Sequence, residues 1–246
     1  MKSIKNSKLY GKEYYQKFEN GFKNTNREDH KRIIQLAKFK KNDKVLEIGC
    51  GYGILLNKIN SLDKIGIETN KYAVNYCLKN KLNVKLDKKI EERINFNSNT
   101  FNFIIMNEVI EHFHNPNAVL KECHRILKTK GKIIITTPIK SIFNQHLSPT
   151  HFSEMNIREM KNILEQNNFK INNFEVNGFR FINLLLRTFI YQPAQFIRKN
   201  KKLKLNKFVN KTQKKYDNLF FNKLMSKYRS NFLNLGSSQL IIAQKI

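Results

Sequence analysis

The chain has 246 residues, of which 40% are hydrophobic and 26% charged, and its formal net charge is +27. A chain of this length can bury one sizeable core, and it lacks both an apolar run of roughly 18 residues that would span a membrane and an apolar signal segment. These features exclude a transmembrane or exported class and predict a cytoplasmic protein. Its three cysteines, Cys50, Cys77 and Cys123, lack metal-ligand spacing, so we expect reduced, buried thiols.

The positive charge invites a nucleic-acid or anionic-membrane partner. Of the 46 basic residues, however, 37 are Lys, and Asn and Ile are also abundant. Lys, Asn and Ile rise together under coding drift as well as under selection of a surface. The charge alone therefore does not define a partner, and nucleic acid is a possible but not a favoured one.

The first 40 residues form an amino-terminal helical segment in this interpretation. Residues 1–24 are polar, basic and aromatic. Thr25 and Glu28 have the spacing of a capping box, which predicts that a helix begins there and continues through Ile33 and Ala37.

The stretch Val45-Leu46-Glu47-Ile48-Gly49-Cys50-Gly51-Tyr52-Gly53 organises the rest of the chain. Its apolar residues predict a short strand buried on both faces, and Ile54-Leu55-Leu56 begins a helical pattern after three alternating glycines. Glycine has no side chain to hold a ligand away, so we expect this turn to leave backbone N–H groups bare for a nucleotide-like ligand. The spacing is Gly-x-Gly-x-Gly, because Ile54 stands where the dinucleotide fingerprint has its third glycine.

A second acidic residue supports the ligand-binding interpretation. Ile65-Gly66-Ile67 predicts another buried strand, with Glu68 at its carboxyl end. Glu68 lies 19 residues after Gly49, close to the spacing of roughly 20 at which nucleotide-binding α/β folds place a carboxylate against ribose hydroxyls.

Further strand and helix patterns alternate along the chain. Asn70, and Asn115 with Pro116, are expected to begin helices, and Gly131 to end the second of these. Ser153 is expected to begin a third helix. This alternation predicts a parallel, doubly wound sheet that binds its ligand at the carboxyl ends of the strands. The additional strands expected are Asn83–Leu86, Phe101–Asn107, Ile133–Ile135, Lys170–Phe179 and Gln239–Ala243.

Residues 180–236 look like an insertion before the last strand. Arg180 to Leu235 contain 14 Lys or Arg residues and one acid, Asp217. The apolar first part predicts a helix that packs on the core or on a second copy, covers an acceptor site, or contacts a membrane surface peripherally through residues 180–215. The Lys-rich part is equally compatible with a solvated linker.

The ordered motifs EIGCGYG, GIE, FNFIIMNEVIEH and LKTKGKIIITTP resemble those of class I S-adenosylmethionine-dependent methyltransferases. The resemblance covers roughly residues 44–179 and the last few residues. It implies a Rossmann-like, mostly parallel seven-stranded sheet formed by residues 41–179 and 237–246. The cofactor implied is S-adenosyl-L-methionine, with a predicted site at Glu47, Gly49, Cys50, Gly51, Gly53, Glu68 and Asn107.

Within the resemblance, Glu47 is expected to help hold the amino end of the methionine. The loop after the third strand is where the family contacts adenine, so Asp87, Ile90 and Glu91 are candidates for that contact, although their sequence matches the family poorly.

Methyl transfer to a hydroxyl requires correct positioning and a proton acceptor. On a helical turn after the fourth strand, Glu108 would share a face with Glu111 or with His112. The predicted catalytic residues are His112, Glu111 and His151. The acceptor expected first is a hydroxyl on a small molecule, a glycan or a lipid-linked intermediate, as in ubiquinone-pathway O-methyltransferases.

Two alternatives remain open. In RNA 3′-end 2′-O-methyltransferases a similar EVIEH stretch joins a later histidine to bind a divalent metal, which would make Glu108, Glu111, His112 and His151 a metal site. The other alternative is a cofactor-binding domain that has lost catalysis and serves as an interaction module.

Overall fold

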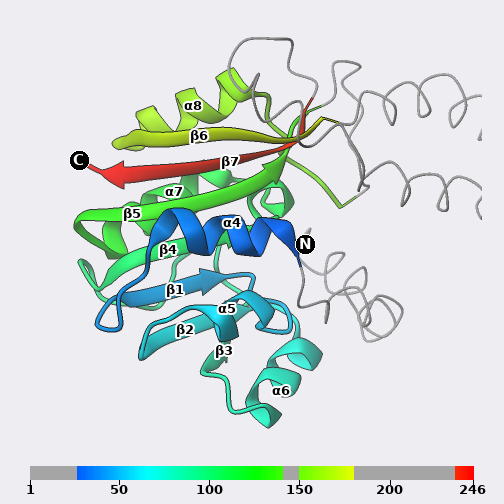
Figure 1. Ribbon diagram of the computed structural model, residues 1–246, viewed down its shortest axis with the longest axis vertical. Coiled ribbons are helices and arrows are strands. Elements are labelled where there is room, and N and C mark those ends of the chain that lie inside the picture. The colour runs from blue at the N-terminus through cyan, green and yellow to red at the C-terminus, as the bar shows by residue number, and fades with distance from the viewer. Residues whose placement is uncertain (1–26, 141–149, 180–235) are drawn as a thin grey trace, which may run out of the picture. The chain divides into compact units, whose positions relative to one another are not determined.

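The computed structural model describes residues 27–140, 150–179 and 236–246 (Figure 1). The expectations for residues 1–26 and for the insertion at 180–235 lie outside the described residues. In chain order the described elements are α4 (Glu28–Ala37), β1 (Lys44–Ile48), α5 (Ile54–Lys58), β2 (Asp63–Glu68), α6 (Lys71–Lys79), β3 (Val84–Leu86), β4 (Phe101–Asn107), the 3₁₀ turn η1 (Ile110–His112), α7 (Pro116–Ile126), β5 (Leu127–Pro138), α8 (Ile157–Gln166), β6 (Phe169–Phe179) and β7 (Gly236–Lys245).

The strands form one seven-stranded sheet in the order β3-β2-β1-β4-β5-β7-β6. Strand β1 pairs in parallel with β2 and β4, and the outer pairs β2–β3 and β4–β5 are parallel as well. Strand β7 runs opposite to its neighbours β5 and β6 (Figure 1). The predicted mostly parallel Rossmann-like sheet is therefore confirmed.

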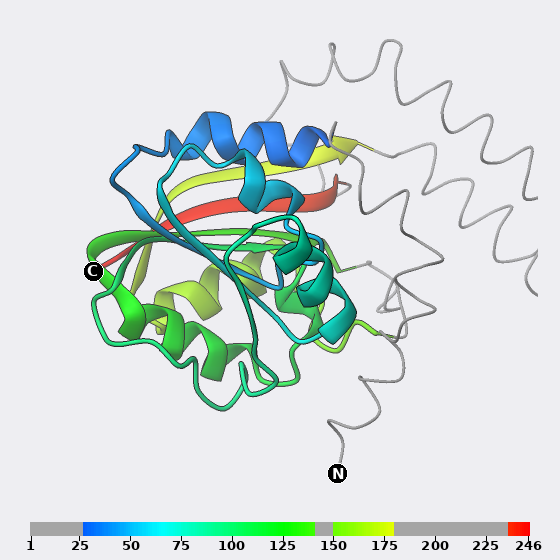
Figure 2. The same ribbon diagram turned by 90° about the horizontal axis from the view of Figure 1, so that it is seen from below.

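Helices cover both faces of this sheet. Helices α4, α5 and α6 lie over one face and α7 and α8 over the other (Figure 2). The strands are apolar on both faces, because neighbouring residues such as Phe103 and Ile104 alternate between the two cores. This double burial explains why β1 and β4 read as continuous apolar runs in the sequence.

The topology places the carboxyl ends of the five parallel strands β3, β2, β1, β4 and β5 at one edge of the sheet. Strand β1 is central, and its last residue, Ile48, is in register with Ile67 of β2 and Met106 of β4. The chain leaves β1 toward β2 on one side and later returns to β4 on the other. Such a switch in strand order is where open α/β sheets bind ligands.

Three predicted helix boundaries need correction. Helix α4 follows Arg27, which makes no side-chain cap, and Thr25 lies outside the described residues. Gly131 does not end a helix, since α7 ends at Ile126 and Gly131 lies within β5. Helix α8 is capped by Asn156 and not by Ser153.

The caps at α6 and α7 are confirmed. The side chain of Asn70 accepts hydrogen bonds from the N–H groups of Tyr72 and Ala73, and Asn115 accepts one from Ala118. These bonds satisfy helix N–H groups that have no partner within the helix.

By its internal contacts the chain divides into two compact units, residues 1–174 with 240–246, and residues 175–239. The first unit contains the central strands and the site described below. Among the helices that the structure describes, none is both long and apolar enough to cross a membrane.

Candidate functional site

The glycine turn joins β1 to α5 and has three residues with positive φ, Gly49 at 67°, Gly51 at 52° and Gly53 at 68°. A side chain at Gly53 would place its Cβ 2.5 Å from Leu82 Cδ1, so this glycine is required by packing as well as by its backbone. A Cβ at Gly51 would meet no atom of the described residues within 4 Å. The turn is therefore open at Gly51 on the side where a ligand can approach.

The expectation of bare N–H groups in this turn is wrong for four of its residues. The N–H groups of Gly49 and Cys50 donate to the carbonyl of Ile67, and that of Gly53 donates to the carbonyl of Cys50. The N–H of Gly51 donates to Glu68 Oε2 over 2.9 Å. Helix α5 has only five residues, so recognition at this turn depends on its shape and on the acids around it.

Glu68 links two turns at the carboxyl ends of the strands by accepting hydrogen bonds from both. Besides the bond from Gly51, its Oε1 accepts hydrogen bonds from the N–H groups of Thr69 at 2.7 Å and Asn70 at 2.9 Å. The carboxylate is 5% exposed. Because each carboxylate oxygen has two lone pairs, these bonds leave acceptor capacity at Oε2 for a ribose hydroxyl.

Glu47 is a buried acid at the end of β1. Its Oε2 has no hydrogen-bond partner among residues 27–140, 150–179 and 236–246. Burial raises the pKa of this carboxyl to about 8, although the N–H of Leu56 partly offsets the effect. An unpaired buried oxygen is costly, and a ligand ammonium group would satisfy it.

Arg27 is a second candidate for binding the ligand, and no sequence pattern pointed to it. It forms a bidentate ion pair with Asp29, with Nε–Oδ1 at 3.0 Å and Nη2–Oδ2 at 2.5 Å. Its positive charge also acts on the carboxylates of Glu47 and Glu108. The bidentate pair with Asp29 uses Nε and Nη2, and the Nη1 group can donate to the carboxylate of an amino-acid ligand.

Asn107 and Glu108 lie at the end of β4 and share Thr136 of β5. The Thr136 hydroxyl donates to Asn107 Oδ1 over 2.5 Å, and the N–H of Glu108 donates to the carbonyl of Thr136 over 2.9 Å. Glu108 has φ of 57° and precedes the 3₁₀ turn. The predicted single helical turn carrying Glu108, Glu111 and His112 is therefore wrong.

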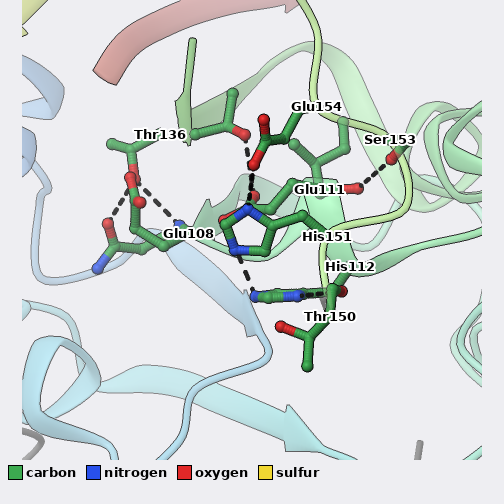
Figure 3. A network of polar contacts seen from close by, with 11 residues as sticks. Glu108, Glu111, His112, Thr136, Thr150, His151, Ser153 and Glu154 are labelled. Atoms are coloured by element: carbon green, nitrogen blue, oxygen red, sulfur yellow. Dashed lines mark hydrogen bonds and ion pairs between the residues drawn. The ribbon is translucent and has the colours of Figure 1, made fainter. Parts of the chain in front are cut away.

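Glu111, His112 and His151 converge next to these strand ends (Figure 3). One oxygen or nitrogen atom from each of the three side chains lies within 4.8 Å of the corresponding atoms of the others. The rings of His112 and His151 meet edge to face with centroids 4.9 Å apart. Glu108 is not a member of this group, so the structure brings together three of the four residues of the alternative metal site.

Hydrogen bonds fix which nitrogen of each ring faces the cluster. His112 Nδ1 lies 3.0 Å from the carbonyl oxygen of Thr150, and His151 Nδ1 is bonded to Glu154 Oε1. A carbonyl or carboxylate oxygen can only accept, so each Nδ1 carries a proton and the neutral ring has its lone pair at Nε2. In Figure 3 the second nitrogens of the two rings point toward each other.

The burial of the cluster shifts its titration. Burial raises the pKa of Glu111 to about 8, the charge of Glu108 adds to this effect, and the Thr137 hydroxyl, which donates to Oε2 over 2.9 Å, opposes it. Burial lowers the pKa of His112, against the effect of its bond to Thr150. At neutral pH the cluster therefore favours a protonated Glu111 carboxyl beside neutral His112, which is the form of histidine that can accept a proton.

The segment Thr150–Glu154 is held against η1 by backbone bonds. The carbonyl of Glu111 accepts from the N–H groups of Phe152 at 2.8 Å and Ser153 at 3.1 Å, and Ser153 Oγ donates to the carbonyl of Ile110 over 3.0 Å. Neither Glu154 nor Thr137 was predicted from the sequence. The spacing of His151 and Glu154, three residues apart, was the available signal for Glu154.

The other predicted contacts of the cofactor have different surroundings. The side chain of Cys50 is buried, and a Cβ at Gly66 would lie 2.6 Å from its sulfur, so contact with a ligand would depend on its backbone. Ile90 is buried in the core, and Glu91 Oε2 accepts from the N–H groups of His114 and Asn115. The side chain of Glu91 thus holds the loop that precedes α7.

The comparisons with known proteins agree with this geometry. The model of a family described as "Methyltransferase domain" matches residues 22–173. The chain is 31% identical over 108 residues to the mitochondrial ubiquinone biosynthesis O-methyltransferase of Rattus norvegicus, covering 40% of this chain and 31% of that protein. It is 26% identical over 136 residues to phosphoethanolamine N-methyltransferase 3 of Arabidopsis thaliana, covering 52% of this chain and 28% of that protein.

Among solved structures, a SAM-dependent methyltransferase from Archaeoglobus fulgidus superposes with a TM-score of 0.61 at 21% identity, over 94% of this chain and all of that one. This likeness shows the fold. The chain spans about a third of the length of the two curated relatives named above. Because the family model covers more than half of the chain, the chain belongs to the methyltransferase domain family, within class I of the S-adenosylmethionine-dependent methyltransferases.

Proposed function

We propose that this protein transfers a methyl group from S-adenosylmethionine to a hydroxyl of a small molecule, a glycan or a lipid-linked intermediate. The observation that carries the proposal is the cluster of Glu111, His112 and His151 at the ends of β4 and β5, in which Glu154 holds His151 Nδ1 and the lone pair of the neutral His151 ring is at Nε2. A hydroxyl acceptor must lose a proton during methylation, and histidine near neutral pH suits that task.

The residues at the carboxyl ends of the strands fit S-adenosylmethionine. The unpaired oxygen of buried Glu47 suits its ammonium group, and Arg27 suits its carboxylate. The open side of Gly51 leaves room for its body, and Glu68 has acceptor capacity for its ribose. When bound, the cofactor supplies a methyl group already activated on a sulfonium sulfur.

The chain itself supplies orientation and a proton acceptor. His112 is held by Thr150 and His151 by Glu154, so both rings keep their Nε2 atoms toward the cluster. One of these nitrogens takes the acceptor's hydroxyl proton. The hydrogen bonds of Thr136, Thr137 and the Thr150–Glu154 segment hold the residues around it in place. Holding reactants and base in place is the main source of rate for such a displacement.

The relatives support a small acceptor, but their names differ in the kind of atom that is methylated. The rat protein's name states O-methylation in ubiquinone biosynthesis, and the Arabidopsis protein's name states N-methylation of phosphoethanolamine. A proton acceptor in the site suits a hydroxyl, which must lose its proton during methylation.

A second candidate is metal-dependent transfer, including transfer to RNA. It is favoured by one ligand atom from each of Glu111, His112 and His151, since these three atoms all lie within 4.8 Å of one another. Glu111, His112 and His151 would hold the ion, and a divalent ion would supply charge stabilisation for an acceptor oxygen.

The test is titration calorimetry with S-adenosylhomocysteine, followed by transfer assays with tritiated cofactor. Catechol, methyl mannoside and a single-stranded oligoribonucleotide serve as acceptors, each with and without a chelator. Transfer to catechol or methyl mannoside that survives the chelator is the expected result. Transfer that needs added metal would favour the second candidate.

Two other outcomes contradict the proposal. Absence of S-adenosylhomocysteine binding would remove the cofactor assignment. Binding without transfer to any acceptor would favour the interaction module that has lost catalysis. Glu68→Ala is the matched variant for binding, and unchanged affinity in it would overturn the ribose assignment.

A further inference from the structure

Glu154 is a buried acid to which the proposed transfer assigns no contact with the cofactor or with the acceptor. It is 4% exposed and lies between the end of the Thr150–Ser153 segment and Met155. Moving a carboxylate out of water costs several kcal/mol unless a partner stabilises it. Such a residue is expected to have a specific partner, and the structure shows which one.

Its partner is His151. Glu154 Oε1 bonds to His151 Nδ1, and the imidazole side chain is itself only 13% exposed. Because this bond places the ring proton at Nδ1, the lone pair of the neutral ring is at Nε2, on the side of His112 (Figure 3). Without the carboxylate, His151 could turn its ring or carry the proton on the other nitrogen.

The backbone around Glu154 is fixed on both sides. On one side, Phe152 and Ser153 are bonded to Glu111, as described above. On the other, Met155 forms a β-bridge with Ile139, and the N–H of Lys140 donates to its carbonyl over 3.2 Å. The carboxylate therefore extends from an anchored backbone toward an anchored ring.

We propose that Glu154 is a positioning residue that holds His151 in its Nδ1–H form, with Nε2 presented to the acceptor oxygen. The proposal rests on the proposed function, because it makes His151 the group that takes the hydroxyl proton. His112, bonded to Thr150, then forms the adjacent wall. The negative charge of Glu154 also stabilises the positive ring that results when Nε2 accepts the proton, as buried acids behind catalytic histidines do.

The deciding experiment is NMR of the isotope-labelled imidazole nitrogens in the chelator-treated complex with S-adenosylhomocysteine. The His151 signals are assigned by their loss in His151→Gln. The variants compared are Glu154→Gln and Glu159→Gln. Glu159 lies five positions along the same segment, and glutamine can keep its capping bond to the N–H of Asn156.

In the unaltered protein we expect His151 to carry its proton on Nδ1 and to have an unprotonated Nε2. Glu154→Gln is expected to change that pattern, because an amide can present either its oxygen or its NH₂ group to the ring. Glu159→Gln is expected to leave the pattern as it is. A proton on Nε2 in the unaltered protein, or an unchanged pattern in Glu154→Gln, would overturn the proposal.

The kinetic consequence separates positioning from support of the fold. With catechol as acceptor, Glu154→Gln should lower kcat by about 10²-fold or more, the size of a lost proton-transfer contribution. The KM for the cofactor and the affinity for S-adenosylhomocysteine should stay unchanged, since Glu154 is not among the residues placed around the cofactor. A kcat equal to that of Glu159→Gln would contradict the proposal.

Failure of the proposed function would look different. If the unaltered protein methylates none of the tested acceptors, the hydroxyl-transfer assignment fails. The NMR result still decides whether Glu154 sets the state of His151, because it needs only the complex with S-adenosylhomocysteine.

Discussion

The buried carboxyl group of Glu47 is expected to change its protonation state when a ligand binds. Its pKa is raised to about 8 by burial, so the side chain carries a proton at neutral pH when no ligand is bound. If an ammonium group takes the place beside Oε2, the ionised form becomes the favoured one. Ligand binding should then be coupled to the release of this proton.

We predict that binding of S-adenosylhomocysteine at about pH 7 releases up to about one proton per molecule, by linkage between the two pKa values. The measurement is calorimetry in buffers of different ionisation enthalpy. Glu47→Gln, which cannot ionise, should bind more weakly and release none. Equal proton release by both proteins would show that Glu47 is not beside the ammonium group.

His30 is a buried residue whose titration lowers the stability of the fold at acid pH. It is buried on α4, its Nδ1 finds no partner within the described part of the chain, and burial lowers its pKa to about 4. The unfolded chain, with an ordinary histidine pKa near 6.5, therefore binds more protons than the folded one between about pH 6.5 and 4. Stability from this neutral residue is present above that window and is lost as the pH falls through it.

We predict that acidification from about pH 7 to pH 5 costs the unaltered protein roughly 2 kcal/mol more of unfolding free energy than it costs His30→Leu. Denaturant titrations at the two pH values measure the difference. Equal losses in the two proteins would mean that His30 is ionised within the fold.

At the scale of elements, the turn between β1 and α5 contains glycines that are required for two different reasons. Gly53 is enclosed by Leu82 and Cys77, whereas Gly51 faces open space, although both have positive φ. The sequence shows three glycines and cannot show which of them faces the ligand.

Gly51→Ala and Gly53→Ala should therefore differ. Both should lose stability of about 1 kcal/mol from strain at positive φ, and Gly53→Ala somewhat more because of its contacts. Only Gly51→Ala adds a methyl group to the open side, and it should weaken S-adenosylhomocysteine binding about tenfold, or about 1.4 kcal/mol. Thermal unfolding and calorimetry check this pair, and equal affinities would show that the ligand does not approach at Gly51.

The start of α8 gives a prediction about stability alone. Asn156 accepts from the N–H of Glu159 at 2.9 Å, and Glu159 Oε2 accepts from the N–H of Asn156 at 2.8 Å. Asn156→Ala should cost about 1 kcal/mol, while Asn156→Asp keeps the cap and should cost little. Denaturant unfolding distinguishes them, and a neutral Asn156→Ala would show that the capping box contributes nothing.

These elements also show where sequence reasoning works. The strands were predictable because both of their faces are buried, which leaves continuous apolar runs such as Ile133–Ile135. The start of α8 was missed because Ser153 and Asn156 are both good caps by composition. Only the packing of Ser153 Oγ against the carbonyl of Ile110, 43 positions earlier, removes it from that role.

At the scale of the whole molecule, local sequence patterns predicted the fold but only part of the candidate site. Glu111 and His112 were predictable because they directly follow a strand end. Arg27 and Glu154 were not, because their roles depend on groups that the fold brings near them: the charges of Glu47 and Glu108 act on Arg27, and Glu154 bonds to His151. Residues brought together by topology leave no periodic signal.

The net charge of +27 gives a prediction about selectivity. We expect a single-stranded oligoribonucleotide to bind at low salt and to lose affinity by a factor of about 10³ or more between 50 and 200 mM salt, because such binding depends on counterion release. Fluorescence anisotropy measures it. Binding that persists at the higher salt, together with methyl transfer to the RNA, would favour the metal-dependent alternative.

The bonds between η1 and the Thr150–Glu154 segment have a consequence for recombination among related sequences. The two histidines lie 39 positions apart, yet the segment around each supplies a backbone oxygen or N–H group that orients the other segment. A chimera that takes one segment from a relative and keeps the other would combine two segments that do not form the same bonds to each other. Exchanges of acceptor preference between such proteins should succeed when both segments are inherited together.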